Sequence, residues 1–242
     1  MDILSAAPFA KPSVFRPGIE EYAERHTTPT HPELDALAAR TREVCPEFSG
    51  MMTSPAQITF LGMLASMVRA ERILEAGTFT GYSALGMARV LPDYGELVTV
   101  DDYSVDDRAR QLALDAFAAS PYGGRVRLVE ADAIAALNSE TGPFDLIFLD
   151  ANKPCHRACY EIIMSRNLLA PNGVLVIDNT LWCGLVLDPP VPGSAHTDPM
   201  ERLMAAWAHD VVALNAHIAG DPRVTNALLT VRDGMSLIRH AH

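Results

Sequence analysis

Two carboxylates, an amide and a lysine follow two apolar runs near the middle of the chain. Asp150 and Lys153 come just after the run Phe144–Leu149. Asp178 and Asn179 follow the next such run. Both runs are short and bounded by turn residues, which is typical of buried strands in a parallel sheet. Open parallel sheets bind ligands beyond the carboxyl ends of their strands. We therefore expect these four side chains to share one cleft.

The four side chains suit a metal-assisted reaction. Asp150, Asp178 and Asn179 offer only hard oxygen ligands, which favour Mg²⁺ or Ca²⁺ over zinc. Lys153 lies three residues past the first carboxylate and is a candidate general base. The alternative is that polar residues simply cap the strand ends. That interpretation would suit any one of these four residues alone, but the four together favour a ligand-binding site.

The composition is that of a globular protein with an acidic balance. The 242 residues are 49% hydrophobic, and 30 acidic against 19 basic residues give a formal charge of −11. This balance argues against nucleic acid or an anionic membrane as a partner, because no basic surplus can neutralise phosphates. No apolar run approaches the roughly 20 residues of a membrane span. Met1–Ala10 has no cationic segment before its apolar residues, so we expect no secretory signal and a cytoplasmic location.

The cysteines follow neither a disulfide spacing nor a zinc spacing. In a reducing cytoplasm we expect buried free thiols at all four positions, Cys45, Cys155, Cys159 and Cys183. The chain also shows no internal repeat and no low-complexity tract.

From residue 72 onward the chain alternates between strand-like and helix-like segments. The predicted strands are Arg72–Ala76, Leu97–Val100, Val126–Glu130, Phe144–Leu149 and Val174–Ile177. The predicted helices between them are Ser83–Leu91, Asp106–Ala119, Ala133–Leu137 and Cys155–Leu169. This alternation is typical of βα units around a parallel sheet.

The two ends of the chain depart from that pattern. Residues 1–17 predict a loose arm, and helices are predicted over Gly18–His26, over Pro32–Val44 and from Ser54 and Pro55 onward. After a helix over Pro199–Asn215, the segments Ala227–Val231 and Met235–His240 predict an antiparallel hairpin with a tight Asp-Gly turn. The expected fold is α/β: a doubly wound, Rossmann-like, seven-stranded mixed sheet with N-terminal helices. Residues 1–52 would form the arm and helices, and residues 53–242 one cofactor-binding domain.

Acidic residues also mark the ends of the first three predicted strands. Glu75 lies just before Gly77 and Gly81, two glycines that let the loop turn tightly and approach a ligand. Asp101 ends the second strand, where an acidic residue commonly bonds ribose hydroxyls, and Asp132 follows the third. Together they predict a pocket for a nucleoside-containing cofactor.

The spacing of the glycines narrows the choice of cofactor. The loop reads G-x-x-x-G, not the G-x-G-x-x-G that cradles a pyrophosphate, and Glu75 would repel a diphosphate. S-adenosylmethionine carries an adenosine, a sulfonium and an ammonium, which suits three acidic strand ends. For Glu75 alone, the alternative to cofactor binding is that it only caps the end of its strand or faces solvent there.

Four segments in combination resemble the cation-dependent O-methyltransferases. This family contains caffeoyl-CoA O-methyltransferase, and catechol O-methyltransferase is a more distant relative. The resemblance covers about residues 19–240. Its segments are Ile73–Ser83 (ILEAGTFTGYS), Phe144–Lys153 (FDLIFLDANK), Val176–Gly184 (VIDNTLWCG) and Asp221–Met235 (DPRVTNALLTVRDGM).

The resemblance implies roles for particular residues. Thr53 would meet the methionine part of S-adenosylmethionine, Asp101 its ribose, and Asp132 with Ala133 its adenine. The other residues at cofactor positions are Glu75, Gly77, Thr78, Ser83 and Asn152. The metal ligands would be Asp150, Asp178 and Asn179, binding Mg²⁺ or else Ca²⁺ or Mn²⁺. Lys153 matches the proposed base, and Cys183 occupies a position near cofactor or substrate.

Several positions depart from the family pattern. Asn152 stands where aspartate is common, His156 where tyrosine is common, and Ile58 where glycine is usual. Asp102 and Tyr103 replace an apolar–acidic pair. None of these changes removes the metal ligands or the base, so we expect an altered acceptor pocket.

The sequence therefore predicts an S-adenosylmethionine- and divalent-metal-dependent O-methyltransferase. Its acceptor would be a small aromatic or natural-product molecule with two adjacent hydroxyls, and the acidic balance disfavours coenzyme A thioesters. Trp182 either walls that acceptor or is an ordinary core residue. Two alternatives are an NAD-type dehydrogenase and a non-catalytic S-adenosylmethionine-binding protein. The N-terminal helices and the resemblance also predict a homodimer.

Overall fold

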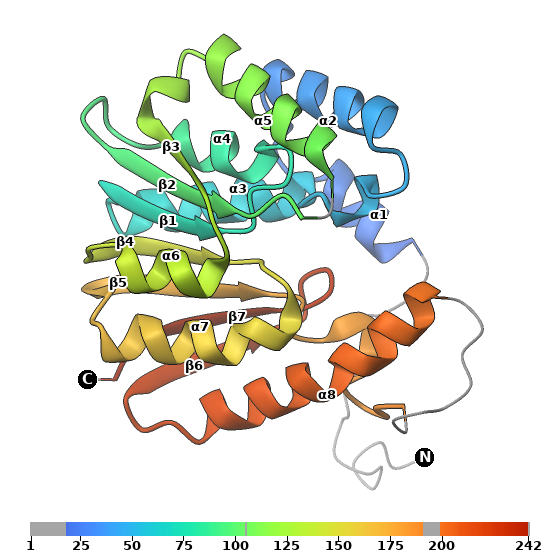
Figure 1. The fold of residues 1–242 in the computed structure, drawn as a ribbon, viewed down its shortest axis with the longest axis vertical. Coiled ribbons are helices and arrows are strands. Elements are labelled where there is room, and N and C mark those ends of the chain that lie inside the picture. The colour runs from blue at the N-terminus through green and yellow to red at the C-terminus, as the bar shows by residue number, and fades with distance from the viewer. Residues whose placement is uncertain (1–17, 105, 191–198, 242) are drawn as a thin grey trace, which may run out of the picture.

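A seven-stranded mixed sheet forms the centre of the molecule (Figure 1). A computed structural model describes residues 18–104, 106–190 and 199–241. The strand order is β3-β2-β1-β4-β5-β7-β6, in which the first five pair in parallel and β7 pairs antiparallel with both β5 and β6. The strands are β1 (Arg72–Ala76), β2 (Glu96–Asp101), β3 (Val126–Glu130), β4 (Phe144–Leu149), β5 (Leu169–Asp178), β6 (Val224–Leu229) and β7 (Met235–His240). The predicted fold is confirmed.

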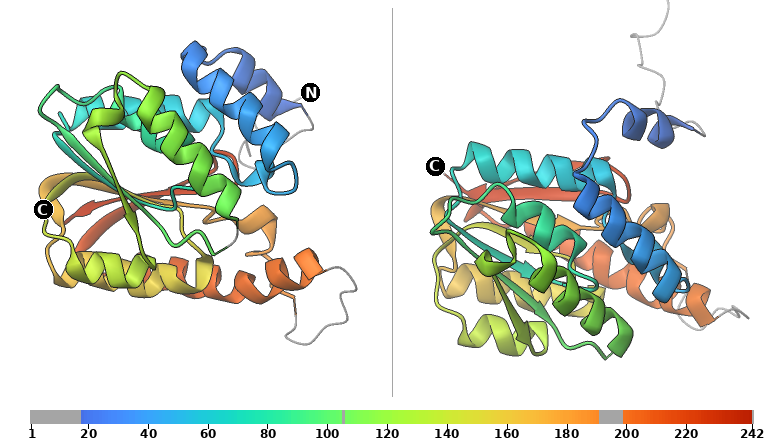
Figure 2. Two further views of the ribbon diagram at one scale, coloured as in Figure 1. Left: turned by 45° about the horizontal axis from the view of Figure 1, so that its top comes forward. Right: turned by 90° about the horizontal axis from the view of Figure 1, so that it is seen from above.

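Helices cover both faces of the sheet, as the left view of Figure 2 shows. One face carries α2 (Pro32–Val44), α3 (Pro55–Met67), α4 (Tyr82–Ala88) and α5 (Asp107–Ala119). The other carries α6 (Ala133–Ser139), α7 (Lys153–Ser165) and α8 (Pro199–Ala219). The remaining helix, α1 (Ile19–Arg25), contacts α3. Among the helices described, none is both long and apolar enough to span a membrane.

Polar side chains start the helices that leave the strand ends. Asp132 caps α6 by accepting hydrogen bonds from the backbone N–H groups of Ile134 and Ala135. Asn152 caps α7 by accepting from Cys155 N–H. Such caps satisfy backbone donors that the first helical turn leaves without partners. These local bonds fix the two segments that lead from β3 into α6 and from β4 into α7. Both segments lie at the edge of the sheet that is predicted to bind ligands.

Some predicted boundaries are wrong. Strand β5 begins at Leu169, five residues before the predicted start, because a register shift opposite Phe144 lets it extend. The hairpin and its tight Asp-Gly turn are present, with Gly234 N–H donating to the Val231 carbonyl at 2.9 Å, but β6 spans Val224–Leu229 instead of Ala227–Val231. The backbone oxygens of Asp233 and Gly234 accept N–H groups of the segment after β5. The hairpin connection, residues 230–234, therefore closes its own turn and also pairs with that segment.

Other predictions have mixed outcomes. The predicted arm over residues 1–17 lies outside the described residues. Cys45, Cys155 and Cys159 are buried free thiols, as expected, but Cys183 is exposed. It lies in the short 3₁₀ turn Trp182–Gly184, where Trp182 is the buried residue.

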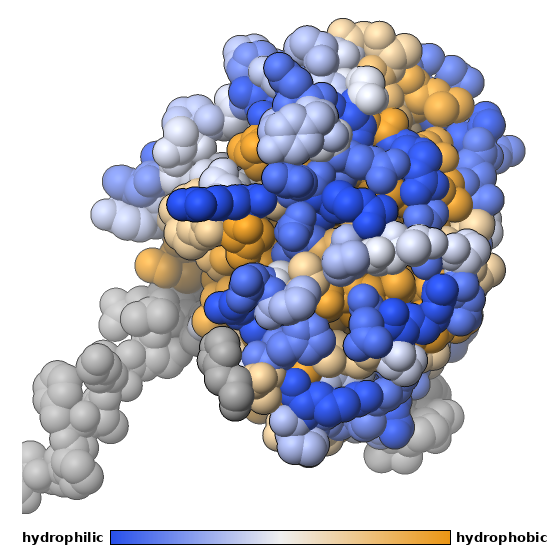
Figure 3. Space-filling view, turned by 90° about the vertical axis from the view of Figure 1, so that its left-hand side faces the viewer, coloured by the Kyte–Doolittle hydropathy of each residue, from blue (hydrophilic) through white to orange (hydrophobic). Residues whose placement is uncertain are grey.

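Ion pairs close the end of the sheet opposite the predicted cleft. Arg127 bonds Glu140 at 2.8 Å and Glu96 at 3.1 Å. Asp145 accepts the backbone N–H of Arg72 at 3.0 Å. Figure 3 views this end, which is largely hydrophilic with smaller apolar areas between the charged groups. The amino ends of the strands are therefore tied together by polar contacts, and the opposite end is left for ligands.

Gly86 in α4 makes room for Ile58, the residue that replaces the usual glycine. A Cβ at Gly86 would lie 2.2 Å from Cγ1 of Ile58, so we expect Gly86→Ala to lower the free energy of unfolding by about 1–3 kcal/mol. Gly62→Ala in α3 is the matched control, because its Cβ would meet Val90 at an ordinary 3.7 Å. Chemical denaturation of both variants, of Ile58→Ala and of Gly86→Ala with Ile58→Ala measures the effect. Because Ile58 is buried and its truncation is itself destabilising, the double variant should be about as stable as Ile58→Ala alone. Equal stability of Gly86→Ala and Gly62→Ala would contradict the expectation.

Candidate active site

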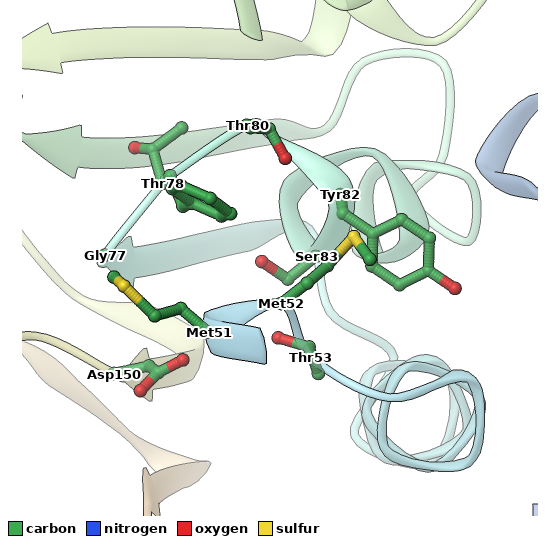
Figure 4. Close-up of a pocket in the computed structure, with 10 residues that line it drawn as sticks. Met51, Met52, Thr53, Gly77, Thr78, Thr80, Tyr82, Ser83 and Asp150 are labelled. Carbon is green, nitrogen blue, oxygen red and sulfur yellow. The ribbon is translucent and has the colours of Figure 1, made fainter. Parts of the chain in front are cut away.

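A pocket lies at the carboxyl ends of β1 and β4 (Figure 4). Its lining comes from the segment before α3, the loop after β1, the start of α4 and the end of β4: Met51, Met52, Thr53, Gly77, Thr78, Phe79, Thr80, Tyr82, Ser83 and Asp150. The side chains of Thr53, Ser83 and Asp150 face the same space in Figure 4. The pocket thus brings together four of the residues predicted to bind cofactor and one predicted metal ligand.

Gly77 lets the loop after β1 approach the end of β4. Its φ is +110°, and a Cβ there would lie 2.3 Å from the backbone oxygen of Asp150. Only glycine fits this close approach, because any side chain would push the two segments apart. Gly81, with φ +82°, then starts α4. The glycine spacing therefore serves to bring the cofactor loop beside the predicted metal ligand.

Glu75 is a fully buried carboxyl group behind this loop. Its Oε2 accepts the Thr99 hydroxyl at 2.5 Å, and Thr99 in turn lies 2.6 Å from the Thr78 hydroxyl. Its Oε1 has no hydrogen-bond partner among the described residues. Burial raises the pKa of Glu75 to about 8, and the charges of Asp150 and Asp101 contribute in the same direction. At neutral pH the group therefore holds a proton.

This proton makes stability depend on pH. Because the pKa of Glu75 is about 8 in the folded chain and near 4.3 when unfolded, its stabilising contribution is complete at low pH and is lost as pH rises towards 8. The slope approaches about 1.4 kcal/mol per pH unit between these values. We expect Glu75→Gln to remove this slope, measured as the free energy of unfolding from pH 5 to 8. Parallel curves for the two proteins would show that Glu75 does not carry the proton.

Four other residues predicted to bind cofactor do not line this pocket. Asp101 accepts the backbone N–H groups of Phe79 at 2.8 Å and Tyr103 at 2.9 Å, so it anchors the cofactor loop. Asp132 and Asn152 are helix caps, and Ala133 is the first residue of α6. All four lie at the ligand-binding edge of the sheet. Their contacts with cofactor remain predictions.

The two predicted carboxylate ligands lie at neighbouring strand ends. Strand register pairs Leu149 with Ile177, so Asp150 and Asp178 follow paired residues at the same edge. Burial, followed by the charge of Asp150, raises the pKa of Asp178 to about 7. Burial likewise raises the pKa of Asp150, although the nearby Lys153 opposes this. Two carboxyl groups are thus held close together in a poorly solvated place, which disfavours their negative charge.

Two segments outside β5 contact the predicted metal ligands at its carboxyl end, Asp178 and Asn179. Gln57 in α3 donates from Nε2 to both carboxylate oxygens of Asp178, each at 3.0 Å. The Asn179 side chain lies beside Asp233 of the hairpin connection, whose carboxylate accepts the backbone N–H of Cys183. The sequence did not predict these contacts. Ser54-x-x-Gln57 matches a capping box, which predicts a helix start but not a bond to a distant aspartate.

Lys153 is held at the start of α7 with 6% of its side chain exposed. Its Nζ donates to Asp150 Oδ1 at 3.1 Å and to the Ala151 carbonyl at 3.1 Å. His156 also bonds that carbonyl, at 2.8 Å, and burial holds the pKa of His156 well below its ordinary value. The neutral ring must therefore donate its N–H there. Lys153 is placed beside a predicted metal ligand by its own helix.

An indole ring lies on the other side of Lys153. The Nζ atom is 5.7 Å from the centre of the Trp182 ring. Trp182 donates its N–H to the Met204 carbonyl at 2.7 Å, and its ring lies 5.9 Å from that of Trp207. Leu185 and Val186 pack against the same cluster. Trp182 is thus both part of an apolar cluster and a neighbour of the candidate base.

The family model described as O-methyltransferase matches residues 24–241. An O-methyltransferase of Aspergillus thermomutatus, ankF, is 35% identical over 91% of this chain and 92% of its own. Caffeoyl-CoA O-methyltransferase 1 of Eucalyptus globulus is 31% identical over 78% of this chain and 74% of its own. A Podospora anserina methyltransferase crystallised with SAH superimposes with a TM-score of 0.86 at 28% identity, covering 96% of this chain and all of that one. The chain therefore belongs to the family of S-adenosylmethionine-dependent O-methyltransferases that includes caffeoyl-CoA O-methyltransferase.

Proposed function

We propose that the protein transfers a methyl group to one of two adjacent hydroxyls on a small, aromatic-type acceptor, with the help of a divalent cation. The observation that carries this proposal is the set of Asp150, Asp178, Asn179 and Lys153 beside the cofactor loop. The family assignment leaves no support for an NAD-type dehydrogenase or a non-catalytic binding protein, and the G-x-x-x-G loop agrees with it.

The donor set fits a hard divalent cation. Asp150, Asp178 and Asn179 would hold it through carboxylate and amide oxygens, the ligands that Mg²⁺, Ca²⁺ and Mn²⁺ prefer. The two neighbouring carboxylates outweigh the single ammonium of Lys153, which bonds Asp150, so an added positive charge would relieve their repulsion. When bound, such a cation lowers the pKa of the acceptor hydroxyl and fixes the position of two acceptor oxygens.

The protein's own residues would supply the remaining steps. Lys153 would accept the proton of the hydroxyl that becomes methylated. Thr53 and Ser83, which face the pocket, would hold the methionine end of the cofactor so that its methyl group meets that oxygen in line. Glu75 would place a carboxyl group behind the positively charged cofactor. Trp182 would form one wall beside a flat acceptor ring.

The acceptor class follows from the apolar cluster and the charge of the chain. Trp182 and Trp207, with Leu185 and Val186 packed beside them, suit an uncharged ring. A coenzyme A thioester carries several phosphate charges, and the net charge of −11 disfavours it. The homodimer and the cytoplasmic location predicted from the sequence remain part of this proposal.

A pair of acceptors that differ by one hydroxyl tests the proposal. Caffeic acid has two adjacent ring hydroxyls and 4-coumaric acid has one, so only the first can offer two oxygens to the site. With methyl-labelled S-adenosylmethionine, we expect the first to be methylated about 10²-fold faster or more, because a single hydroxyl loses its orientation. Equal rates on both acceptors would refute the adjacent-hydroxyl requirement.

A further inference from the structure

The start of helix α3 reaches across to the proposed metal site through one side chain. Gln57 is 4% exposed, and its Nε2 lies 3.0 Å from each carboxylate oxygen of Asp178. Its Oε1 accepts the backbone N–H of Ser54 at 3.1 Å, while the Ser54 hydroxyl accepts the Gln57 N–H at 3.2 Å. Because a backbone donor holds Oε1, the amide can turn only Nε2 towards Asp178.

We propose that Gln57 is a positioning residue that orients Asp178 for the divalent cation. Its Nε2 bonds both oxygens of the carboxylate, and the backbone N–H of Asn179 also donates to Oδ1 at 2.8 Å. These contacts fix the plane of the carboxylate and leave Oδ2 with a lone pair for a metal ion. Because the Gln57 amide is neutral, it orients Asp178 without cancelling the negative charge that attracts the cation. Asp150 is held differently, because the ammonium of Lys153 bonds one of its oxygens at 3.1 Å. This inference rests on the proposed metal-dependent function.

The structure also links this contact to the cofactor pocket. Thr53, which lines the pocket, directly precedes Ser54, the N-cap of α3. The start of α3 thus lies between a residue of the cofactor pocket and a proposed metal ligand, and only the Gln57 side chain contacts that ligand. A helix cap alone would need only the bonds within α3. The two further bonds to Asp178, which lies 121 residues away, are not part of capping.

Two variants separate positioning from capping. Gln57→Met keeps the length of the side chain but removes both donors to Asp178. Ser54→Ala removes the capping hydroxyl but keeps the backbone N–H that holds the Gln57 amide, so the bonds to Asp178 remain. Mn²⁺ binding to each purified protein, measured by the electron paramagnetic resonance signal of the free ion, is the readout. Thermal unfolding of the same samples reports the loss of the cap.

We expect Gln57→Met to bind Mn²⁺ about 10- to 100-fold more weakly, as found when partners of metal ligands are removed. Ser54→Ala should keep the wild-type affinity and unfold at a lower temperature. If Gln57 served only as a cap, both variants would lose stability and keep their affinity, which would overturn the inference. Gln57→Ala provides the same test if Gln57→Met does not fold. Failure of the wild-type protein to bind Mn²⁺ would instead refute the proposed metal site.

Discussion

Replacing Lys153 with methionine is expected to lower kcat by about 10²–10⁴-fold, the usual loss when a general base is removed. The Nζ atom lies 3.1 Å from Asp150 and beside the Trp182 ring, where the acceptor oxygens would lie. Methionine keeps the length of the side chain but removes the nitrogen that would take the proton of the acceptor. Cofactor affinity should barely change, and some activity should return at high pH, where hydroxide can ionise the acceptor.

Lys153→Arg separates catalysis from charge balance. Arginine keeps the positive charge beside Asp150 but cannot give up its proton at ordinary pH. If Lys153 is the base, Lys153→Arg should be nearly as impaired as Lys153→Met at pH 7. Steady-state kinetics of both variants from pH 7 to 10 provide the measurement. Near-normal turnover of Lys153→Arg at pH 7 would show that the lysine only balances the charge of the carboxylates.

The sheet and the helix starts could be predicted because their signals are local. The runs at Phe144–Leu149 and Arg72–Ala76 have the observed strand boundaries, since buried parallel strands need continuous apolar residues. Ser54 and Pro55 start α3 as expected, because a cap acts within a single turn. Once the boundaries of the strands are known, the residues at their carboxyl ends are known as well. That is why Asp150 and Asp178 could be expected at one edge.

The parts that could not be predicted depend on contacts between distant segments. Nothing near Gln57 in the sequence indicates its bonds to Asp178, and nothing near Asp233 indicates its bond to the backbone of Cys183. The pairing of the hairpin connection with the segment after β5 was not predicted for the same reason. Asp101 was expected to face ribose, yet its carboxylate also anchors the cofactor loop through Phe79 and Tyr103. Local patterns reveal such residues but not all of their partners.

Removal of divalent cations is expected to lower the rate of methyl transfer by about 10²–10³-fold. A phenol with a pKa of about 10 is ionised in only about one molecule in a thousand at pH 7. Lys153 alone, held by Asp150 and the Ala151 carbonyl, has no means of orienting two acceptor oxygens. Both the ionisation and the orientation of the acceptor would be lost with the cation. Cofactor binding should persist, because Thr53 and Ser83, which face the pocket, are not among the proposed metal ligands.

The initial rate of methyl transfer to caffeic acid, with excess EDTA and then with Mg²⁺ added back, tests the metal-dependent function most directly. The protein is first freed of bound metals, and calorimetry with S-adenosylmethionine confirms that it remains folded and binds cofactor. Asp178→Ala serves as the matched variant, since added Mg²⁺ should not restore its rate. We expect the wild-type rate to fall in EDTA and to return with Mg²⁺. Full turnover in excess EDTA would contradict a catalytic metal at Asp150, Asp178 and Asn179.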